Sequence, residues 1–104
     1  MAAEHPLTLE VLSGPLDGLT VVLEATAEWR RDGDGPLAFP WDAELGKPQA
    51  RFFLEGGRWY LEGLDAPHGT YRLNREERLT GRKAPLESED VLKASQTWLL
   101  VRQA

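Results

Sequence analysis

The sequence predicts an all-β fold, a sandwich of short strands. Two observations carry this prediction: short runs alternate apolar with polar residues, and clusters of Gly, Pro, Asp and Asn separate these runs at close spacing. In addition, no segment sustains the apolar period of an amphipathic helix. Many short strands divided by turns are typical of sandwiches and barrels.

The first third of the chain contains three predicted strands. Leu7–Val11 alternates with period two, and Leu19–Leu23 follows a loop, Ser13–Gly18, that holds two glycines and a proline. We expect these two strands to pair as antiparallel neighbours. Thr26–Arg30 is the third predicted strand, and residues 1–6 are expected to form a loose tail. The residues of the second strand expected to face inward are Leu19, Val21 and Leu23.

The middle of the chain carries the clearest local signal. Residues 31–48 are predicted as loops, interrupted by a brief strand at Leu37–Phe39. Ala50–Glu55 and Arg58–Glu62 then flank Gly56-Gly57, and a Gly-Gly pair supplies the positive φ that a tight hairpin requires. The residues of this hairpin expected to be buried are Phe52, Leu54, Trp59 and Leu61.

The last third begins with a turn-rich segment, Leu64–Asn74, that runs directly into strand residues. Loops of this kind, held at the mouth of a β-framework, commonly bind partners. The remaining predicted elements are a solvated charged turn at Arg75–Arg78, a short strand at Leu79–Thr80, a loop at Ala84–Asp90 and a final hairpin of Asp90–Ala94 with Gln96–Val101.

Composition limits the function classes. A chain of 104 residues is long enough for one domain with its own core, which we place at residues 7–104. A net charge of −5 argues against binding to nucleic acid or to anionic lipid. The absence of cysteine excludes disulfides and thiolate metal sites. Without a signal pattern or a long apolar run, we expect a cytoplasmic protein. Frequent Leu, Ala, Gly and Arg suggest a GC-rich bacterial genome.

Five segments stand in a fixed order along the chain: Leu9–Gly18, Trp29–Asp34, Leu45–Phe52, Leu64–Tyr71 and Leu86–Leu92. The third is similar to the Ser-Arg-x-His-Ala-x-Ile segment of the forkhead-associated (FHA) domain family, and the fourth to its Leu-x-Ser-Thr-Asn-Gly-Thr-Phe segment. The others resemble its opening strand and glycine turn, its Gly-Arg acidic turn and its late Leu-x-x-Gly-Asp-x-Ile. The resemblance covers roughly residues 7–102. It implies an eleven-stranded β-sandwich with binding loops at one end.

FHA domains typically recognise phosphothreonine peptides, and a phosphate needs charge-assisted donors around it. The resemblance places Arg31 at the phosphate-side arginine of the family. Arg30 replaces the glycine before it. Gly46 replaces a serine whose hydroxyl donates to the phosphate, and Lys47 replaces an arginine, so the guanidinium fork is lost.

The other recognition positions are also changed. Gln49 replaces a loop-bracing histidine and can still form hydrogen bonds, which makes this the mildest change. Pro67 replaces a threonine that helps to select phosphothreonine, and it lacks a backbone N–H. His68 replaces an asparagine that grips the peptide backbone. Gly69 and Thr70 are kept and are expected to serve the turn.

These changes predict a weak grip on phosphate. Losing the serine and asparagine contacts removes about 3–6 kcal/mol if nothing replaces them. Nearby carboxylates add repulsion toward a phosphate, and three cations offset this repulsion only in part. The carboxylates are Asp32, Asp34, Asp42, Glu44 and Asp65, and the cations are Arg31, Lys47 and Arg72.

We therefore expect a non-enzymatic FHA-like module for protein–protein contact, with lost or weakened phosphothreonine recognition and no cofactor. One alternative is a genuine phosphothreonine reader that uses Arg31, Lys47 and His68 in a variant pocket. A second is a structural or self-assembling domain of a larger bacterial machine. The expected partner is a protein or peptide, phosphorylated or not. The candidate partner face is Arg30, Arg31, Trp41, Gly46, Lys47, Gln49, Pro67, His68, Gly69 and Arg72.

Other site chemistries find little support. His68, Asp65 and Thr70 have no spacing that enforces a catalytic triad, which is recognised in space and not along the chain. His5 and His68 with scattered carboxylates do not form a metal-ligand cluster.

The four tryptophans receive different interpretations. Trp59 and Trp98 lie in apolar alternation and are expected in the core, while Trp29 is expected to be half-buried. Trp41 lies in a loop, where it is either a partly exposed interface residue at the binding end or a plug at the end of the sandwich.

Overall fold

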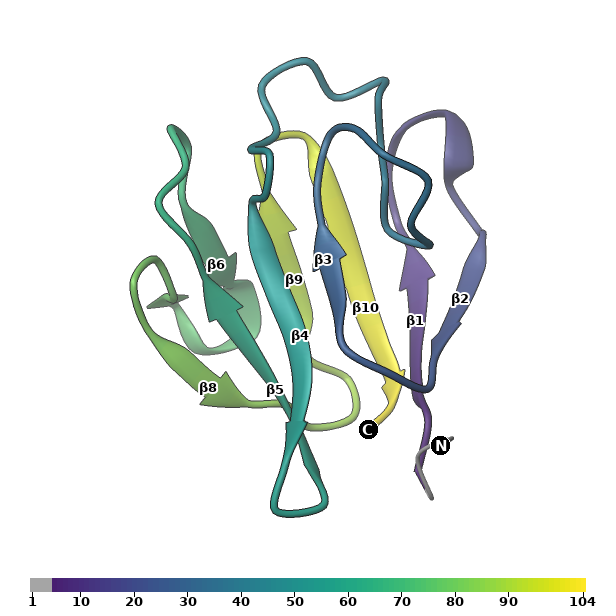
Figure 1. Cartoon of the computed structure of the whole chain (residues 1–104), viewed down its shortest axis with the longest axis vertical. Helices are drawn as coiled ribbons and strands as arrows, with labels where there is room; N and C mark the ends of the chain where they lie inside the picture. Colours follow the sequence, from purple (N-terminus) through teal and green to yellow (C-terminus); the bar gives the residue numbers. More distant parts are fainter. Residues whose placement is uncertain (1–4) are drawn as a thin grey trace.

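A computed structural model describes residues 5–104 of the chain, which form two antiparallel sheets packed face to face (Figure 1). The six-stranded sheet has the order β2-β1-β10-β9-β6-β7, and the four-stranded sheet has the order β3-β4-β5-β8. The strands are β1 (Leu7–Val11), β2 (Thr20–Leu23), β3 (Ala27–Trp29), β4 (Ala50–Glu55), β5 (Arg58–Gly63), β6 (Thr70–Arg72), β7 (Glu77–Arg78), β8 (Lys83–Pro85), β9 (Val91–Ala94) and β10 (Thr97–Gln103). Two short 3-10 turns are η1 (Gly14–Leu16) and η2 (Leu73–Arg75).

The core lies between the sheets and is built by period-two alternation. Leu7, Leu9 and Val11 of β1 are buried, and Phe52 of the opposite sheet stacks on Trp29 with ring centroids 6.1 Å apart. Burying such a side chain stabilises the fold by about 1.5–3 kcal/mol relative to leaving it exposed. The predicted sandwich is confirmed.

The predicted hairpins are confirmed with their turns. Gly56 and Gly57 both have positive φ, of 61° and 77°, and they connect β4 to β5. Strand β1 pairs antiparallel with β2 as expected, and β9 pairs with β10. Each of these pairs is formed by neighbours in the chain, so local sequence signals were sufficient to find it.

The strand count differs from the expectation: the described residues form ten strands, not eleven. The predicted strand at Leu37–Phe39 reduces to one isolated parallel bridge between Arg30 and Ala38. The predicted strand at Leu79–Thr80 is likewise one bridge, to Gly63. Conversely, β7 and β8 form where a solvated turn and a loop were predicted. Their partners, β6 and β5, supply the pairing that their own sequences do not signal.

Several burial predictions were wrong. Leu19, Leu54 and Trp98 are 44%, 36% and 37% exposed, although each was predicted to face inward. For Trp98 the reason is register, because Leu99 faces the core and its neighbour must face out. Leu54 lies near the tip of the β4–β5 hairpin, which extends past the sandwich (Figure 1). Trp29, predicted as half-buried, is fully buried.

The loops gather at one end of the sandwich. The segments 40–49 and 64–69 and the β9–β10 turn lie at the top of Figure 1, opposite the Gly56-Gly57 turn. The predicted tail at residues 1–6 lies largely outside the described residues. At its described end, the His5 carbonyl accepts a hydrogen bond of 2.6 Å from Trp59 Nε1. Within residues 5–104, no helix is long and apolar enough to cross a membrane.

Candidate binding face at the loop end

Two loops are held together by one buried amide. Gln49 is fully buried; its Oε1 accepts the Gly46 N–H at 2.8 Å, and its Nε2 donates to the Gly69 carbonyl at 2.8 Å and to Thr70 Oγ1 at 3.0 Å. The segment 40–49 is thereby fixed to the segment 64–69. Gln49 thus braces the loops, as its hydrogen-bonding capacity suggested, but its side chain is not available to a ligand. We call Arg31, Gly46, Lys47, Pro67, His68 and Gly69 the loop face.

Gly46 has no room for a side chain. A Cβ at this position would lie 2.8 Å from the Cβ of Ala66 and 2.9 Å from the carbonyl oxygen of Pro48. The Gly46 carbonyl accepts the Arg31 N–H at 3.0 Å, so the backbone is fixed on both sides. The space that a serine would need is therefore filled by Ala66 and by the neighbouring backbone.

The three basic side chains of the loop face differ in availability. Arg31 is half-buried, and its Nη1 donates to the Ala43 carbonyl at 2.8 Å. His68 is half exposed, and its Nε2 lies 3.0 Å from Glu44 Oε2. Lys47 is exposed, and in the described part of the chain its ammonium has no carboxylate within 4 Å. Lys47 is the cation with the least competition for a new partner.

Arg30 is engaged next to the loop face. Its guanidinium pairs with Glu28 and, at 2.9 Å, with Asp32. The hydrogen bond to Asp32 is the main cause that raises the pKa of Arg30, and the same bond lowers the pKa of Asp32. The charges of Arg30 and Asp32 thus largely balance each other. Arg30 lines a groove along β2 and β3 rather than the loop ends.

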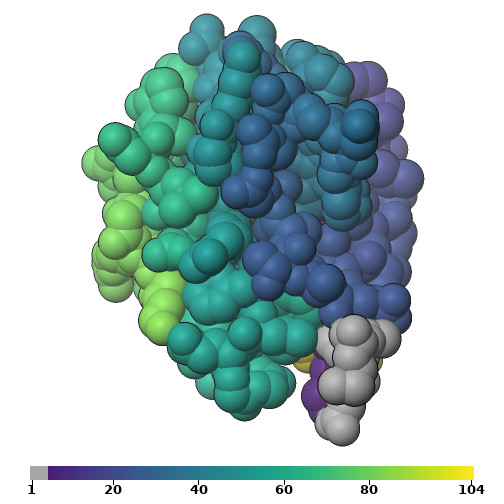
Figure 2. All heavy atoms as spheres, in the orientation of Figure 1, coloured from purple at the N-terminus to yellow at the C-terminus, as the bar shows by residue number. Residues whose placement is uncertain are grey.

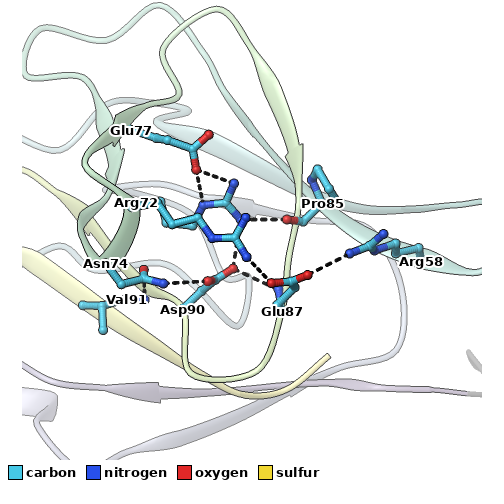
Figure 3. Close-up of polar contacts among 9 residues, drawn as sticks. Arg58, Arg72, Asn74, Glu77, Pro85, Glu87, Asp90 and Val91 are labelled. Atoms are coloured by element: carbon cyan, nitrogen blue, oxygen red, sulfur yellow. Dashed lines mark hydrogen bonds and ion pairs between the residues drawn. The ribbon is translucent and has the colours of Figure 1, made fainter.

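Arg72 is not part of a partner face, which corrects the prediction. Its side chain is only 3% exposed, and the guanidinium is enclosed by acceptors (Figure 3). Its Nη1 donates to Asp90 Oδ2 at 3.0 Å and to the Pro85 carbonyl at 2.8 Å, while Nε donates to Glu77 Oε1 at 2.6 Å. Sequence reasoning could not find this, because Asp90 lies on a different segment and only the fold joins the two.

Asp90 completes this buried network. Burial raises the pKa of Asp90, but hydrogen bonds from Asn74 Nδ2, from the Glu87 N–H and from Arg72 outweigh burial and leave the pKa lowered. The first two bonds are each 2.9 Å long. The carboxylate is therefore charged in the folded protein and holds η2, β6 and the loop before β9 together (Figure 3).

Trp41 is only partly exposed and packs as a plug. Its ring lies so close to η1 that a Cβ on Gly14 would come within 2.5 Å of it, and it packs against the core. This geometry supports the packing interpretation of Trp41; a role in partner binding stays a prediction.

Sequence reasoning missed two anchors of the loop end. Asp42, taken above as a free negative charge, is 1% exposed; its carboxylate accepts hydrogen bonds from Ser95 Oγ at 2.7 Å, the Gln96 N–H at 2.9 Å and Thr97 Oγ1 at 2.8 Å. It ties the segment 40–48 to the β9–β10 turn, and its carboxylate is held in the interior rather than displayed on the loop face. The second anchor is Thr80, whose Oγ1 accepts the Thr70 N–H at 3.1 Å. Short hydroxyl side chains at a turn are the only sequence signal for either anchor.

The loop face continues into a groove of about 510 Å³. His68 and Glu44 form one wall, and Tyr71 of β6 and Lys93 of β9 form the other. A larger groove of about 610 Å³ lies elsewhere, along β2 and β3, and of the residues predicted for the partner face it includes only Arg30. Across residues 5–104, no cluster of three or more His, Cys, Asp or Glu side chains could hold a metal ion.

Comparisons with known proteins support the fold. No family model and no curated protein matches the chain. The FHA domain of an Arabidopsis thaliana hypothetical protein has a TM-score of 0.85 at 22% identity, covering 100% of this chain and 91% of that one. The FhaA FHA domain, solved in complex with the intracellular domain of Rv3910, has a TM-score of 0.76 at 23% identity, covering 92% and 99%. An FHA domain from a study of phosphothreonine-dependent interactions has a TM-score of 0.76 at 22% identity, covering 95% and 97%. The fold is that of FHA domains.

Proposed function

We propose that this chain, which has the FHA fold, is a non-enzymatic module for protein–protein contact whose loop face binds a protein or peptide partner. Residues 7–104 act as the module. Recognition of phosphothreonine is weakened or lost in this proposal. The role as a binding module is supported by the comparisons, because solved FHA domains are described in phosphothreonine-dependent interactions and in complex with a partner domain.

The observation that carries the weakened phosphate grip is the crowding at Gly46. FHA domains typically place a serine hydroxyl there, and here Ala66 and the Pro48 carbonyl fill that space. Two of the three basic side chains are already engaged, Arg31 with the Ala43 carbonyl and His68 with Glu44. A phosphate would have to displace these partners before it gained any contact.

The magnitude is large enough to matter. Losing two hydrogen bonds to a charged group removes about 3–6 kcal/mol, which corresponds to a loss of about 10²-fold to 10⁴-fold in affinity. A micromolar peptide ligand would then bind in the high micromolar to millimolar range or weaker.

A second candidate function is phosphothreonine reading through a variant pocket. The observation that favours it is Lys47, which is exposed and, within residues 5–104, forms no ion pair with a carboxylate within 4 Å. A lysine is a compact point charge that binds phosphate without a fork. In this case Arg31 and His68 would exchange their present partners for the phosphate.

Peptide titration separates the two candidates. Fluorescence anisotropy of a phosphothreonine peptide library, beside the same peptides unphosphorylated, measures the phosphate dependence directly. We expect no peptide for which phosphorylation improves the affinity more than about threefold. Micromolar binding that requires the phosphate and is lost in Lys47→Ala would establish the second candidate.

Partner capture tests the loop face itself. We expect the double variant Lys47→Ala and His68→Ala to lose partners that the wild type retains from cell extract. The matched control is Arg58→Ala, an exposed cation at the opposite end of the sandwich (Figure 1). If the control loses the same partners, or the double variant keeps them all, the loop face is not the binding face.

A further inference from the structure

The two sheets have four edge strands, and three of them are protected against pairing with another chain. Strand β7 consists of the charged pair Glu77 and Arg78, and β8 carries Lys83 and Pro85. The edge of β3 carries Glu28, and directly after the strand Arg30 forms an isolated bridge to Ala38. Charges, prolines and cover are the devices by which sheet edges avoid unwanted strand addition.

The fourth edge, β2, has none of these devices. Its sequence, Thr-Val-Val-Leu, carries no charge and no proline. Val22 is 54% exposed, and the residue before the strand, Leu19, is 44% exposed. An uncharged apolar edge of this kind is a template for an added strand.

The backbone of β2 presents free hydrogen-bonding groups on its outer side. The Val11 N–H donates to the Leu19 carbonyl at 2.8 Å, and in an antiparallel ladder every second residue faces the same partner. Thr20 and Val22 therefore direct N–H and C=O away from β1. In the described part of the chain, β1 is the only strand that pairs with β2.

A groove of about 610 Å³ runs beside this edge, between β2, β3 and the segment 33–36. In Figure 2 the part of the chain that follows β2, in blue, lies over the centre and right of the visible face. Its apolar wall includes Ala25, Ala27 and Pro36. An added strand would place alternate side chains against this wall.

The groove is lined mainly by acidic side chains, which favours a basic segment as its occupant. Glu24, Glu28 and Asp34 line it against a single cation, Arg30, which is paired with Glu28. A second copy of this chain fits poorly, because its own β2 carries no cation and the residues that flank it, Asp17 and Glu24, would bring like charges to an acidic groove. A segment with lysine or arginine fits well.

We propose that the β2 edge and its groove form a second docking site, for an extended segment of another protein that alternates apolar with Lys or Arg residues. The segment adds as a seventh strand to the six-stranded sheet. Its apolar residues lie against Ala25 and Pro36, and its basic residues meet Glu24 and Asp34. This site shares no residue with the loop face.

The probe is an acetylated, amidated hexapeptide with the repeat Lys-Val, titrated into the ¹⁵N-labelled protein. We expect saturable shifts of the amides of Thr20 to Leu23 and slower hydrogen exchange at Thr20 and Val22. Val22→Lys should weaken binding at least tenfold while the variant stays folded, since the side chain is exposed. The matched control Leu54→Lys, at an exposed residue of the far hairpin, should bind as the wild type does.

The following results would overturn the proposal. A peptide of the same composition in two blocks, three Lys then three Val, binding equally well would reduce the effect to charge attraction. Unchanged binding to Val22→Lys, or shifts confined to the loop face, would exclude the edge. A dimer seen by sedimentation and dissolved by Val22→Lys would assign the edge to a second copy.

Discussion

At the scale of single residues, the loop end depends on Gln49. Its buried amide satisfies one backbone donor, one backbone acceptor and one hydroxyl that belong to two different loops. A buried polar group that loses its partner costs far more than a formed hydrogen bond gains. Gln49 therefore fixes the positions of Gly46 and Gly69, and its own side chain is buried away from any ligand.

Gln49→Leu should reduce the free energy of unfolding by about 2–4 kcal/mol, because it leaves buried groups of Gly46, Gly69 and Thr70 without partners. Urea unfolding followed by tryptophan fluorescence measures this. Gln49→Glu, with the same shape and one retained acceptor, should keep the bond from Gly46 and lose the two that Nε2 donates. A cost below about 0.5 kcal/mol for Gln49→Leu would mean that the three bonds do not hold the loops.

Gly46→Ser should fail to restore phosphate binding and should destabilise the fold by about 1–3 kcal/mol, because its Cβ would meet Ala66 and Pro48. Adding Ala66→Gly should recover part of the lost stability, since it removes one of the two contacts. Thermal unfolding and phosphopeptide titration of the single and double variants check this. A single variant that gains phosphate affinity at full stability would contradict it.

The sequence reveals which residue types lie at the loop end, but it does not reveal for each of them whether the side chain points outward or into the interior. The role of Gln49 followed from its hydrogen-bonding capacity and its place in the motif. Arg72 and Asp42 were misjudged because each is held by partners that are distant in sequence. Asp90 pairs with Arg72, and neutral hydrogen-bond donors of the β9–β10 turn bind Asp42. A charged residue read alone looks solvated.

At the scale of elements, the Arg72–Asp90 network joins β6 to the loop before β9 (Figure 3). Asp90→Ala should lower the free energy of unfolding by about 3–5 kcal/mol, because it leaves a buried guanidinium short of one carboxylate. The matched control is Arg58→Ala, which removes an exposed pair with Glu87 at 3.5 Å and should cost at most about 1 kcal/mol. If the two variants lost the same free energy of unfolding, the buried pair would contribute no more to stability than the exposed one.

The same carboxylate makes stability fall in acid. The pKa of Asp90 is lowered by folding, so its contribution is fully present above the unfolded pKa of about 3.9 and is lost as pH falls through the folded value. Unfolding free energies from urea titrations should therefore drop below about pH 4 in the wild type. In Asp90→Asn this drop should be smaller. Parallel pH profiles for the two proteins would assign the acid sensitivity to other carboxylates.

Which elements could be predicted depended on where their partners lie. The β4–β5 and β9–β10 hairpins pair neighbouring segments, and the residues that form each turn lie directly between the two strands in the sequence. β8 pairs with β5 across a long separation, and its run of Lys-Ala-Pro carries no strand signal of its own. Leu37–Phe39 has the apolar residues of a strand, but only one bridge forms there because neighbouring turns leave no room for a ladder.

At the scale of the whole molecule, the sandwich separates the two proposed binding surfaces by position. The loop face lies at one end, the start of β1 and the end of β10 lie toward the other, and the unprotected β2 edge lies along one side (Figure 1). Thr8 and Gln103 are paired across β1 and β10, so the described chain ends lie about 5 Å apart at that level. The order of motifs indicated this architecture, but the free edge became visible only from the pairing of all ten strands.

This arrangement predicts that the chain tolerates circular permutation. Joining the chain ends through a short Gly-Ser linker and opening the chain between Gly56 and Gly57 should give a folded protein whose loop face is unchanged. The reason is that the new join and the new ends both lie away from the loop end, and the opened turn is exposed. Amide spectra of the loop-face residues, compared with those of the wild type, measure this.

The matched permutant has the same linker but is opened between Pro67 and His68. It cuts the loop that Gln49 holds through Gly69, so it should lose the wild-type amide shifts at Gly46, Lys47 and Gly69 even if the sandwich forms. If both permutants keep these shifts, the loop face does not depend on the continuous 64–69 segment. If both lose them, the loop face is coupled to the hairpin end through the sheets, and the separation of the proposed binding surfaces by position does not hold.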